Sequence, residues 1–237
     1  MLDSNIINKY QEFARATLGF PFDNPELLVT AFTHRSYVNE HKKSAKEHNE
    51  RLEFLGDAVL ELAVTQYLYV NYSEPEGILT NWRAALVRTE SISAAASRLG
   101  FADMLRLSRG ERQGSDRAKH QILANSFEAV TGAIYLDQGY ERADEFIAKH
   151  ILTTFADILE TGSWRDAKSQ LQEVAQSIDG HTPAYRVLNE DGPDHDKIFT
   201  LGVFVGDKLL GKGTGPSKQV AQQAAAQAAL QHYQKQV

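Results

Sequence analysis

The sequence predicts a two-part fold, an all-α N-terminal domain followed by a small α+β domain with the element order α-β-β-β-α. Up to about residue 158, apolar residues recur every three or four positions, as amphipathic helices require. The segment ETGSW at 160–164 has the composition of a short linker. Beyond it, three short apolar runs alternate with Gly, Pro and Asp, which is typical of strands joined by turns.

The composition is that of a globular protein and excludes several chemistries. Of the 237 residues, 42% are hydrophobic and 24% charged, which suffices for two domains with cores of their own. The sequence has no cysteine, which excludes disulfides, thiolate metal sites and cysteine nucleophiles. No apolar run approaches the roughly 20 residues that cross a bilayer, and the N-terminal segment lacks a secretory pattern. We therefore expect a cytoplasmic protein without a membrane partner.

We expect a helical domain over residues 1–160, a linker over 161–164 and the second domain over 165–237. Within the helical domain, NYSEPEGILT marks one break, and SRGERQGSDRAKH marks a second that we expect to be a basic, mobile loop. In the second domain, RDAKSQLQEVAQSI predicts a helix, and PAYRVLNEDG, KIFTLGVFVG and KLLGKGTG predict strands. SKQVAQQAAAQAALQHYQKQ predicts a closing helix capped by Ser217.

The charge is unevenly distributed along the chain. The formal net charge is −6, but the sequence after Asp207 has no acidic residue. It contains four lysines, namely Lys208, Lys212, Lys218 and Lys235. The C-terminal end therefore forms a locally basic surface on an acidic protein, which is suited to an anionic partner.

The stretch HNERLEFLGDAVL, residues 48–60, predicts a helix with two different faces. Glu50, Glu53 and Asp57 fall within an arc of about 60°. The leucine and valine side chains are expected to point the other way, toward a core; they are Leu52, Leu55, Val59 and Leu62. The acidic face is then available to a cationic ligand or partner.

A second helix, ILANSFEAVTGAIYLD at 122–137, repeats this arrangement. Asn125 and Glu128 project opposite a predicted core stripe of Leu123, Phe127, Val130 and Ile134. If the two polar faces meet, four carboxylates and an amide share one pocket, and like charges so close together require a cation. Oxygen ligands alone favour Mg²⁺ or Mn²⁺. Considered one at a time, however, the spacing of either helix favours a plain solvated surface.

The same segments resemble the ribonuclease III family. HNERLEFLGDAVL matches the signature of this family, and FTHRSY at 32–37, PEGILTNWRAALV at 75–87 and ILANSFEAVTGAIYLD follow in the family's order. The α-β-β-β-α part resembles a double-stranded-RNA-binding domain. The resemblance implies a homodimer that hydrolyses double-stranded RNA with Mg²⁺, leaves 5′-phosphates and short 3′ overhangs, and processes ribosomal and other precursor RNAs.

The resemblance also assigns roles to residues. It implies that Glu53, Asn125 and Glu128 bind the metal and that Asp57 acts with Glu128 in catalysis by orienting the water. Glu50 and Glu76 would be supporting acids, and Phe54 would anchor the dimer in a socket of the other subunit. The family usually has Asp where this chain has Asn125, so the charge of the site is lower by one.

For the second domain, the resemblance implies contacts with the 2′-hydroxyls and phosphates of A-form RNA. The expected contact residues are Gln172, Glu173, Gln176, His195, Lys212 and Lys218. Gln219 and Gln222 stand where the family often has lysines. We therefore expect weak binding by one domain and reliance on the two domains of a dimer.

Two other classes of function compete with this interpretation. A non-catalytic duplex-RNA-binding protein would keep the helical domain for dimerisation only. Such a protein loses its acidic residues, whereas this chain has lost only one negative charge, at Asn125. A small-molecule phosphohydrolase of the all-α metal type would need His/Asp motifs that HRSY and EHNE do not provide.

Overall fold

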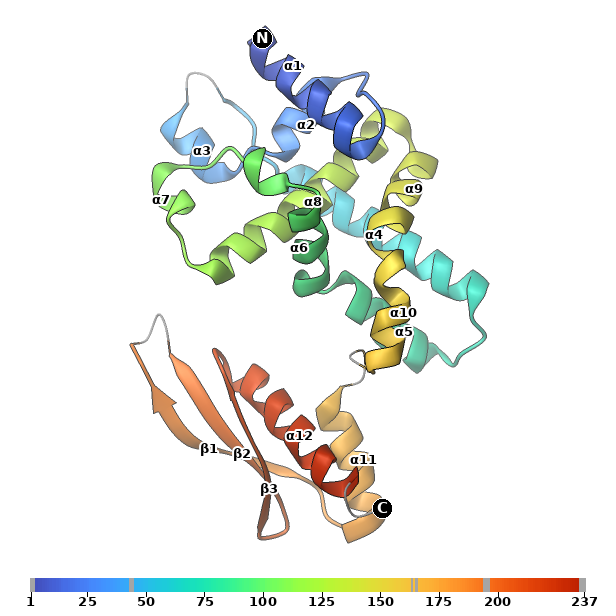
Figure 1. The fold of residues 1–237 in the computed structure, drawn as a ribbon, viewed down its shortest axis with the longest axis vertical. Helices are drawn as coiled ribbons and strands as arrows, with labels where there is room; N and C mark the ends of the chain where they lie inside the picture. The colour runs from blue at the N-terminus through green and yellow to red at the C-terminus, as the bar shows by residue number, and fades with distance from the viewer. Residues whose placement is uncertain (1–2, 43–44, 163, 165, 194–196, 235–237) are drawn as a thin grey trace. The chain divides into compact units, whose positions relative to one another are not determined.

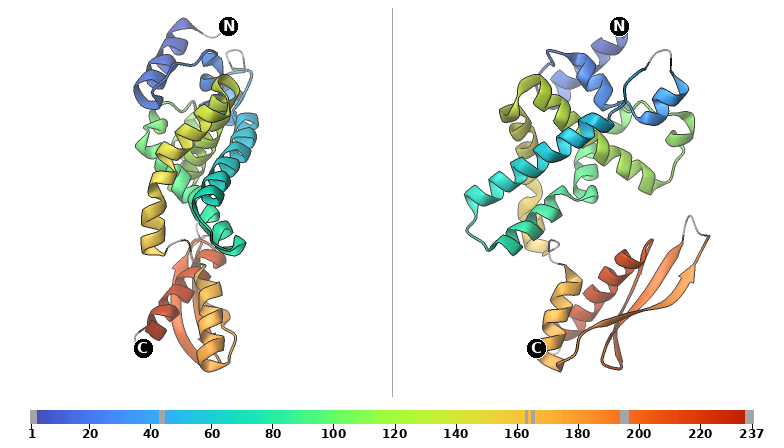
Figure 2. Two further views of the ribbon diagram at one scale, coloured as in Figure 1. Left: turned by 90° about the vertical axis from the view of Figure 1, so that its right-hand side faces the viewer. Right: turned by 180° about the vertical axis from the view of Figure 1, so that it is seen from behind.

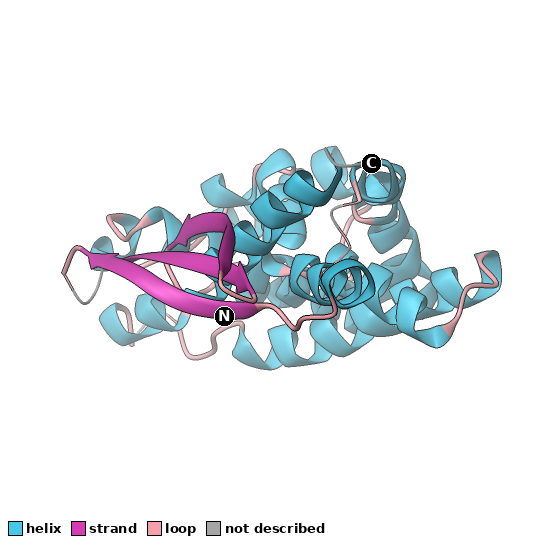
Figure 3. Ribbon diagram, turned by 90° about the horizontal axis from the view of Figure 1, so that it is seen from below, coloured by secondary structure: helices cyan, strands magenta, loops and turns pink. Residues whose placement is uncertain are grey.

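The computed structural model describes residues 3–42, 45–162, 164, 166–193 and 197–234. The chain divides between residues 164 and 165 into two compact units, here called the helical unit and the sheet unit. Over the described ranges, the helical unit contains helices only, and the sheet unit contains a three-stranded sheet and two helices, which confirms the predicted fold class. Figures 1 and 3 show this arrangement. No helix of the described residues is long and apolar enough to span a bilayer.

The helical unit is built around two long helices, α4 (Glu50–Asn71) and α8 (Asp116–Gln138), which cross in the views of Figures 1 and 2. Shorter helices surround this pair. They are α1 (Ser4–Phe13), which continues into a π-helical turn (Ala14–Leu18), α2 (Pro25–Ala31), α3 (Arg35–Glu40), α5 (Glu76–Val87), α6 (Thr89–Arg98), α7 (Arg109–Arg112), α9 (Tyr140–His150) and α10 (Phe155–Thr161).

The predicted mobile loop at 108–120 is partly wrong, because it contains helix α7 and the first turn of α8. Serine caps explain both helix starts. Ser108 Oγ accepts a hydrogen bond from the Glu111 amide at 3.1 Å, and Ser115 Oγ accepts one from the Ala118 amide at 3.3 Å. Of the two glycines that predicted a break, Gly110 lies within α7 and Gly114 lies between the two capped helices.

The crossing of α4 and α8 depends on two glycines. A Cβ atom on Gly56 would lie 1.7 Å from the Glu128 carbonyl oxygen, and one on Gly132 would lie 2.3 Å from the Leu52 carbonyl oxygen. Both distances are far inside van der Waals contact, so the two backbones touch where a side chain would otherwise separate them. The glycines therefore fix which turns of α4 and α8 face each other.

Aromatic rings fill the core around this crossing. Phe32 packs edge-on against Phe101 at 4.9 Å between ring centres, and Phe127 of α8 stacks on Phe146 of α9 at 5.0 Å. The predicted core stripe of α8 is confirmed, since Leu123, Phe127, Val130 and Ile134 are all buried.

The prediction for Leu62 is wrong, because this side chain is exposed. The buried face of α4 centres on Leu52, Gly56, Val59 and Ala63. Leu62 lies about 80° from that centre, at the edge of the face, and it emerges on the outer surface of the helix.

The sheet unit contains α11 (Ala167–Asp179), β1 (Ala184–Asp191), β2 (Ile198–Val205), β3 (Lys208–Gly215) and α12 (Lys218–Gln234). The strands form an antiparallel sheet in the order β1-β2-β3, and the helices cover one face (Figure 1). Ser217 caps α12 as predicted, by accepting a hydrogen bond from the Val220 amide at 3.3 Å.

Strand β3 and helix α12 interlock through very small side chains. A Cβ on Gly211 would lie 2.3 Å from the Ala225 carbonyl oxygen, and one on Gly213 would lie 2.2 Å from the Ala225 amide nitrogen. Successive residues of a strand point to opposite faces, so Lys212 and Thr214 point away from α12.

Replacing either crossing glycine should destabilise the helical unit. Because the added methyl would force the two backbones apart, Gly56→Ala and Gly132→Ala should each lower the free energy of unfolding by about 1–3 kcal/mol or more. Thermal unfolding followed by circular dichroism measures this. Gly77→Ala is the control, since nothing lies within 4 Å of its Cβ, and it should leave the melting temperature unchanged or slightly higher. A Gly132→Ala protein as stable as the parent would contradict the proposed packing.

Candidate active site

The glycine crossing brings the acidic faces of α4 and α8 together. Glu128 precedes the crossing on α8, and its backbone lies directly against Gly56. Glu53 and Asp57 flank Gly56 on α4, one turn apart on the same side of the helix. The structure therefore places carboxylates from two distant segments of the chain beside one another.

The electrostatics of Glu128 show how closely these groups interact. Burial, followed by the charges of Asp57 and Glu53, raises the pKa of the Glu128 carboxyl to about 8. Burial also raises the pKa of Glu53, with further contributions from the charges of Glu50 and Asp57. The charged neighbours responsible for both shifts are all carboxylates, so the cluster lacks an internal counter-charge at its centre.

Glu50 differs from the other acids because a guanidinium lies beside it. Its carboxylate lies 3.3 Å from the Arg35 guanidinium, and His48 Nδ1 lies 3.8 Å from its second oxygen. Arg35 is 15 residues upstream, on α3, where helical periodicity gives no sign of the pairing. Glu50 therefore occupies the rim of the cluster, where its charge is already partly balanced.

Asn125 is held between two neighbours. Gln121 Nε2 donates a hydrogen bond to Asn125 Oδ1 at 2.7 Å, and Asn125 also hydrogen-bonds the Glu53 side chain. A carboxylate only accepts, so the Asn125 amide nitrogen faces Glu53 and its oxygen faces Gln121. The sequence interpretation missed Gln121, although its i, i+4 spacing to Asn125 on α8 is a usable signal.

Glu76 is not brought to this cluster within the chain. It is the first residue of α5, which starts after the C-terminal end of α4. The intervening length of α4, from Glu53 to Asn71, is about 27 Å at the rise of an α-helix. Glu76 is exposed and lies near the far end of the central helix.

The donor set fits a hard divalent cation by its chemistry. Glu53, Asp57 and Glu128 offer oxygen ligands, and their mutual repulsion favours a cation among them. Within the described part of the chain, no three of the His, Asp and Glu side chains already stand in a metal-binding arrangement. Side-chain rotations of the acids would therefore have to accompany metal binding.

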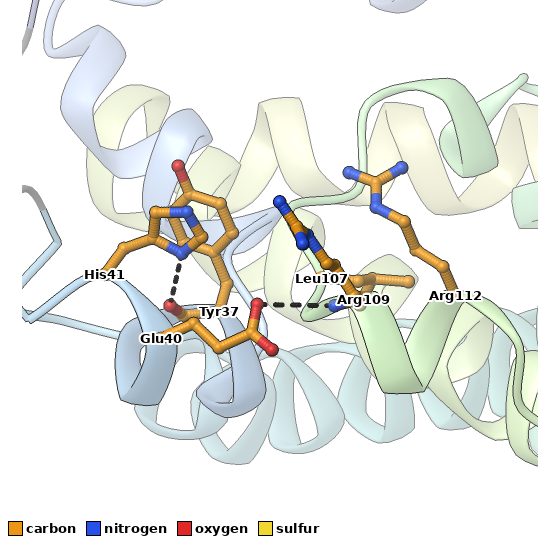
Figure 4. Close-up of a pocket in the computed structure, with 6 residues that line it drawn as sticks. All are labelled: Tyr37, Glu40, His41, Leu107, Arg109 and Arg112. Carbon is orange, nitrogen blue, oxygen red and sulfur yellow. Dashed lines mark hydrogen bonds between the residues drawn. The ribbon is translucent and has the colours of Figure 1, made fainter.

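A second polar feature is a cavity of about 470 Å³ between α3 and α7 (Figure 4). Tyr37 and His41 stack there with ring centres 4.0 Å apart, and the Arg106 guanidinium covers Tyr37 at 4.3 Å. Arg109 and Arg112 line the cavity from α7, and Glu40 accepts a hydrogen bond from the Arg109 amide at 3.3 Å. The cationic side chains expected in a mobile loop thus stand on a short, capped helix.

The candidate contact residues of the sheet unit lie on different surfaces. Gln172, Glu173 and Gln176 are exposed on α11, and Gln176 donates a hydrogen bond to Thr182 Oγ1 at 3.2 Å. Lys218 begins α12, whereas Lys212 points from the opposite face of the sheet and does not join it. His195 lies outside the described residues.

The N-terminal half of α12 has a cation that the sequence interpretation missed. Lys168 of α11 donates a hydrogen bond from Nζ to Gln222 Oε1 at 2.8 Å. Gln222 is one of the two positions where the family often has lysine, so an ammonium from the neighbouring helix lies beside it. The two residues are 54 positions apart, so no local sequence pattern predicts this contact.

Comparisons with known proteins define the class to which this chain belongs. The family model described as ribonuclease-III-like matches residues 24–155, and the double-stranded RNA binding motif matches residues 167–233. The chain thus joins a nuclease unit of this type to an RNA-binding unit.

Relatives extend the similarity over nearly the whole chain. Ribonuclease 3 of Oceanobacillus iheyensis is 48% identical over 217 residues, covering 90% of this chain and 93% of the relative. Ribonuclease 3 of Latilactobacillus sakei is 45% identical, covering 92% and 94%. The crystallised nuclease domain of ribonuclease III from Campylobacter jejuni superposes with a TM-score of 0.53 at 37% identity, covering 61% of this chain and 95% of that one. The chain belongs to the ribonuclease III family, and it is an endoribonuclease of the double-stranded-RNA-specific class.

The raised pKa of Glu128 predicts that this residue destabilises the metal-free protein at alkaline pH. Its pKa rises from 4.5 to about 8 on folding, so the folded state retains a proton that the unfolded state has released within this window. The resulting loss of stability grows as pH rises through the window and is absent below it. In EDTA, Glu128→Gln should therefore melt roughly 2–6 °C above the parent at pH 8, with a difference that narrows toward pH 5.

Glu12→Gln, an exposed position on α1, is the control for this measurement and should follow the parent at every pH. A melting difference for Glu128→Gln that is constant from pH 5 to pH 8 would show that folding does not raise the pKa of this carboxyl.

Proposed function

We propose that the acid cluster of α4 and α8 is the centre at which double-stranded RNA is hydrolysed with Mg²⁺, for which Mn²⁺ can substitute. The observation that carries this proposal is the convergence of Glu53, Asp57 and Glu128 beside the backbone contact of the two helices. The family match supports the same conclusion. The retained acids argue against a protein that only binds RNA.

The proposed roles follow from the position of each side chain. Glu53 and Glu128 hold the cation. Asn125 becomes a further ligand through its side-chain oxygen once this atom turns away from Gln121. Asp57, which is exposed beside them, orients the attacking water. A cation held there would polarise the attacking water and offset the charge that develops on the phosphoryl group. Glu50 contributes at the rim, where Arg35 also offers a charge to the RNA backbone.

The sheet unit is proposed to hold the duplex. Exposed Gln172, Glu173 and Gln176 present hydrogen-bonding groups along α11, which suits the 2′-hydroxyls of a minor groove. Lys218 lies at the N-terminus of α12, where backbone amides favour phosphate. These contacts recognise the geometry of an A-form duplex and not its base sequence. The proposed substrates are therefore precursor RNAs with long helices, including ribosomal precursors.

We further propose a homodimer built on α4. Phe54 is 82% exposed and Tyr69 79%, and Leu62 is exposed between them. These three side chains fall within about 80° of one another and form an apolar stripe along the helix. Beside Phe54 lies a hollow of about 910 Å³, lined in part by Leu27, Thr30, Arg51, Leu55 and Leu136. In a symmetric dimer, Phe54 of each copy would insert into the hollow of the other copy.

Two copies related by a two-fold axis would give two cleavage centres. Each centre would cut one strand, and offset cuts would leave short 3′ overhangs. The proposed 5′-phosphates require that water attacks phosphorus and that the 3′ oxygen leaves. The related nuclease domain of ribonuclease III from Campylobacter jejuni likewise has a region that is involved in dimer formation.

The test of the chemistry is cleavage of a labelled RNA hairpin with and without Mg²⁺. The parent should cut only with a divalent cation, and Glu128→Gln should lower the rate by roughly two orders of magnitude or more, because the cluster loses a charged ligand from α8. Binding of the hairpin without metal should be retained. Glu12→Gln is the matched control and should cut at the parental rate. A parent that binds the hairpin but leaves it intact in both Mg²⁺ and Mn²⁺ would favour the non-catalytic alternative.

The test of the dimer is Phe54→Ala. Removal of a central aromatic anchor should weaken self-association by roughly a hundredfold and give monomers in light scattering at low micromolar concentration. The circular dichroism spectrum should not change, because most of the side chain is exposed within its own chain. Val187→Ala, an exposed apolar position on β1, should stay dimeric. If Phe54→Ala remained dimeric as well, the interface would have to lie elsewhere.

A further inference from the structure

Three charged side chains meet at one end of the sheet. Glu190 is the second-last residue of β1, Lys197 directly precedes β2, and Lys218 is the first residue of α12. The Lys218 ammonium lies 3.4 Å from one carboxylate oxygen of Glu190, and the Lys197 ammonium lies 3.7 Å from the other. A single carboxylate therefore bridges two ammonium groups that come from different elements.

The surroundings of this trio favour interaction with an external anion. Glu190 pairs across the sheet with Phe199, and the Lys218 ammonium lies 5.5 Å from the centre of the Phe199 ring. All three charged side chains are partly accessible to solvent, with Lys218 the most exposed at 58%. An anion arriving from solvent can therefore reach Lys218 while Glu190 remains within ion-pair distance of the same ammonium.

The charges of this trio have opposite effects on an RNA phosphate, because the two lysines attract it and Glu190 repels it. A phosphate that contacts Lys218 or Lys197 approaches a carboxylate on the far side of the ammonium, at a separation of about 6–7 Å. Exposed ion pairs contribute little to folding, so Glu190 is not required to hold the unit together. Its main electrostatic effect then falls on whatever anion the lysines bind.

We propose that Glu190 is an internal competitor of the RNA phosphates and sets the affinity and the salt dependence of duplex binding by the sheet unit. This inference rests on the proposed RNA-binding role of that unit. Glu190 occupies the lysines in the absence of RNA and repels the backbone when RNA is bound. It is a residue that limits affinity, and its removal strengthens binding.

The experiment measures binding of the full chain to a labelled RNA hairpin in EDTA, over a range of NaCl concentrations. Glu190→Gln keeps the shape of the side chain and removes the charge. It should bind roughly three- to tenfold more tightly than the parent at low salt, the range expected for removing one like charge at this distance. The slope of log affinity against log salt should become steeper by about one, since Lys218 would release an additional counterion when it binds a phosphate.

Two further proteins separate this effect from net charge and from folding. Asp207→Asn removes the same charge from the turn between β2 and β3, roughly 25 Å away along the strand, and should change affinity less than twofold. In a Lys197→Gln/Lys218→Gln background, Glu190→Gln should give no gain in affinity.

The outcomes distinguish this inference from the proposed function. Binding by Glu190→Gln that equals or falls below that of the parent would overturn the inference while leaving duplex recognition intact. An equal gain from Asp207→Asn would overturn it too, because net charge would then explain the result. A parent that does not bind the hairpin at all would overturn the RNA-binding role itself.

Discussion

The direct backbone contact between α4 and α8 is the constraint on which the rest of the helical unit depends. Gly56 and Gly132 let the helices approach until carbonyl and amide groups of one touch the other. Because a helix is rigid over a few turns, this contact fixes where the neighbouring side chains emerge. The carboxylates of Glu53, Asp57 and Glu128 are close together because they emerge next to the point of closest approach. Packing and chemistry at this site have the same origin.

The acids are not equivalent once their surroundings are compared. Glu128 is the most perturbed, since burial and two carboxylates all disfavour its charged form. Glu53 has the Asn125 amide as a compensating donor, and Glu50 has Arg35. The neutral residue at position 125 thus acts on the cluster in two ways, by removing a negative charge and by donating a hydrogen bond that an aspartate could not donate.

Much of the fold was predictable because periodicity and turn residues are local signals. The core stripe of α8, the three strands and the Ser217 cap all follow from residues a few positions apart. The interactions that were missed join distant segments: Arg35 with Glu50, and Lys168 with Gln222. The burial of Leu62 was predicted wrongly because this residue lies at the boundary of the buried face of α4. At such a position, the neighbouring elements determine whether the side chain is buried. The acid-bearing faces were predictable, but the register of their meeting was not.

The interlock of Gly211 and Gly213 with the alanines of α12 has a consequence for how this sheet unit diverges among relatives. The side chains that hold α12 on the sheet are nearly all hydrogen or methyl, whereas Gln219 is exposed and lies outside this packed face. Substitutions on the outer face therefore leave the packing untouched. Lysine, glutamine or glutamate can be exchanged there one at a time, and each exchange gives a folded domain with a different hold on RNA. Selection can tune substrate affinity in small increments without passing through unstable intermediates.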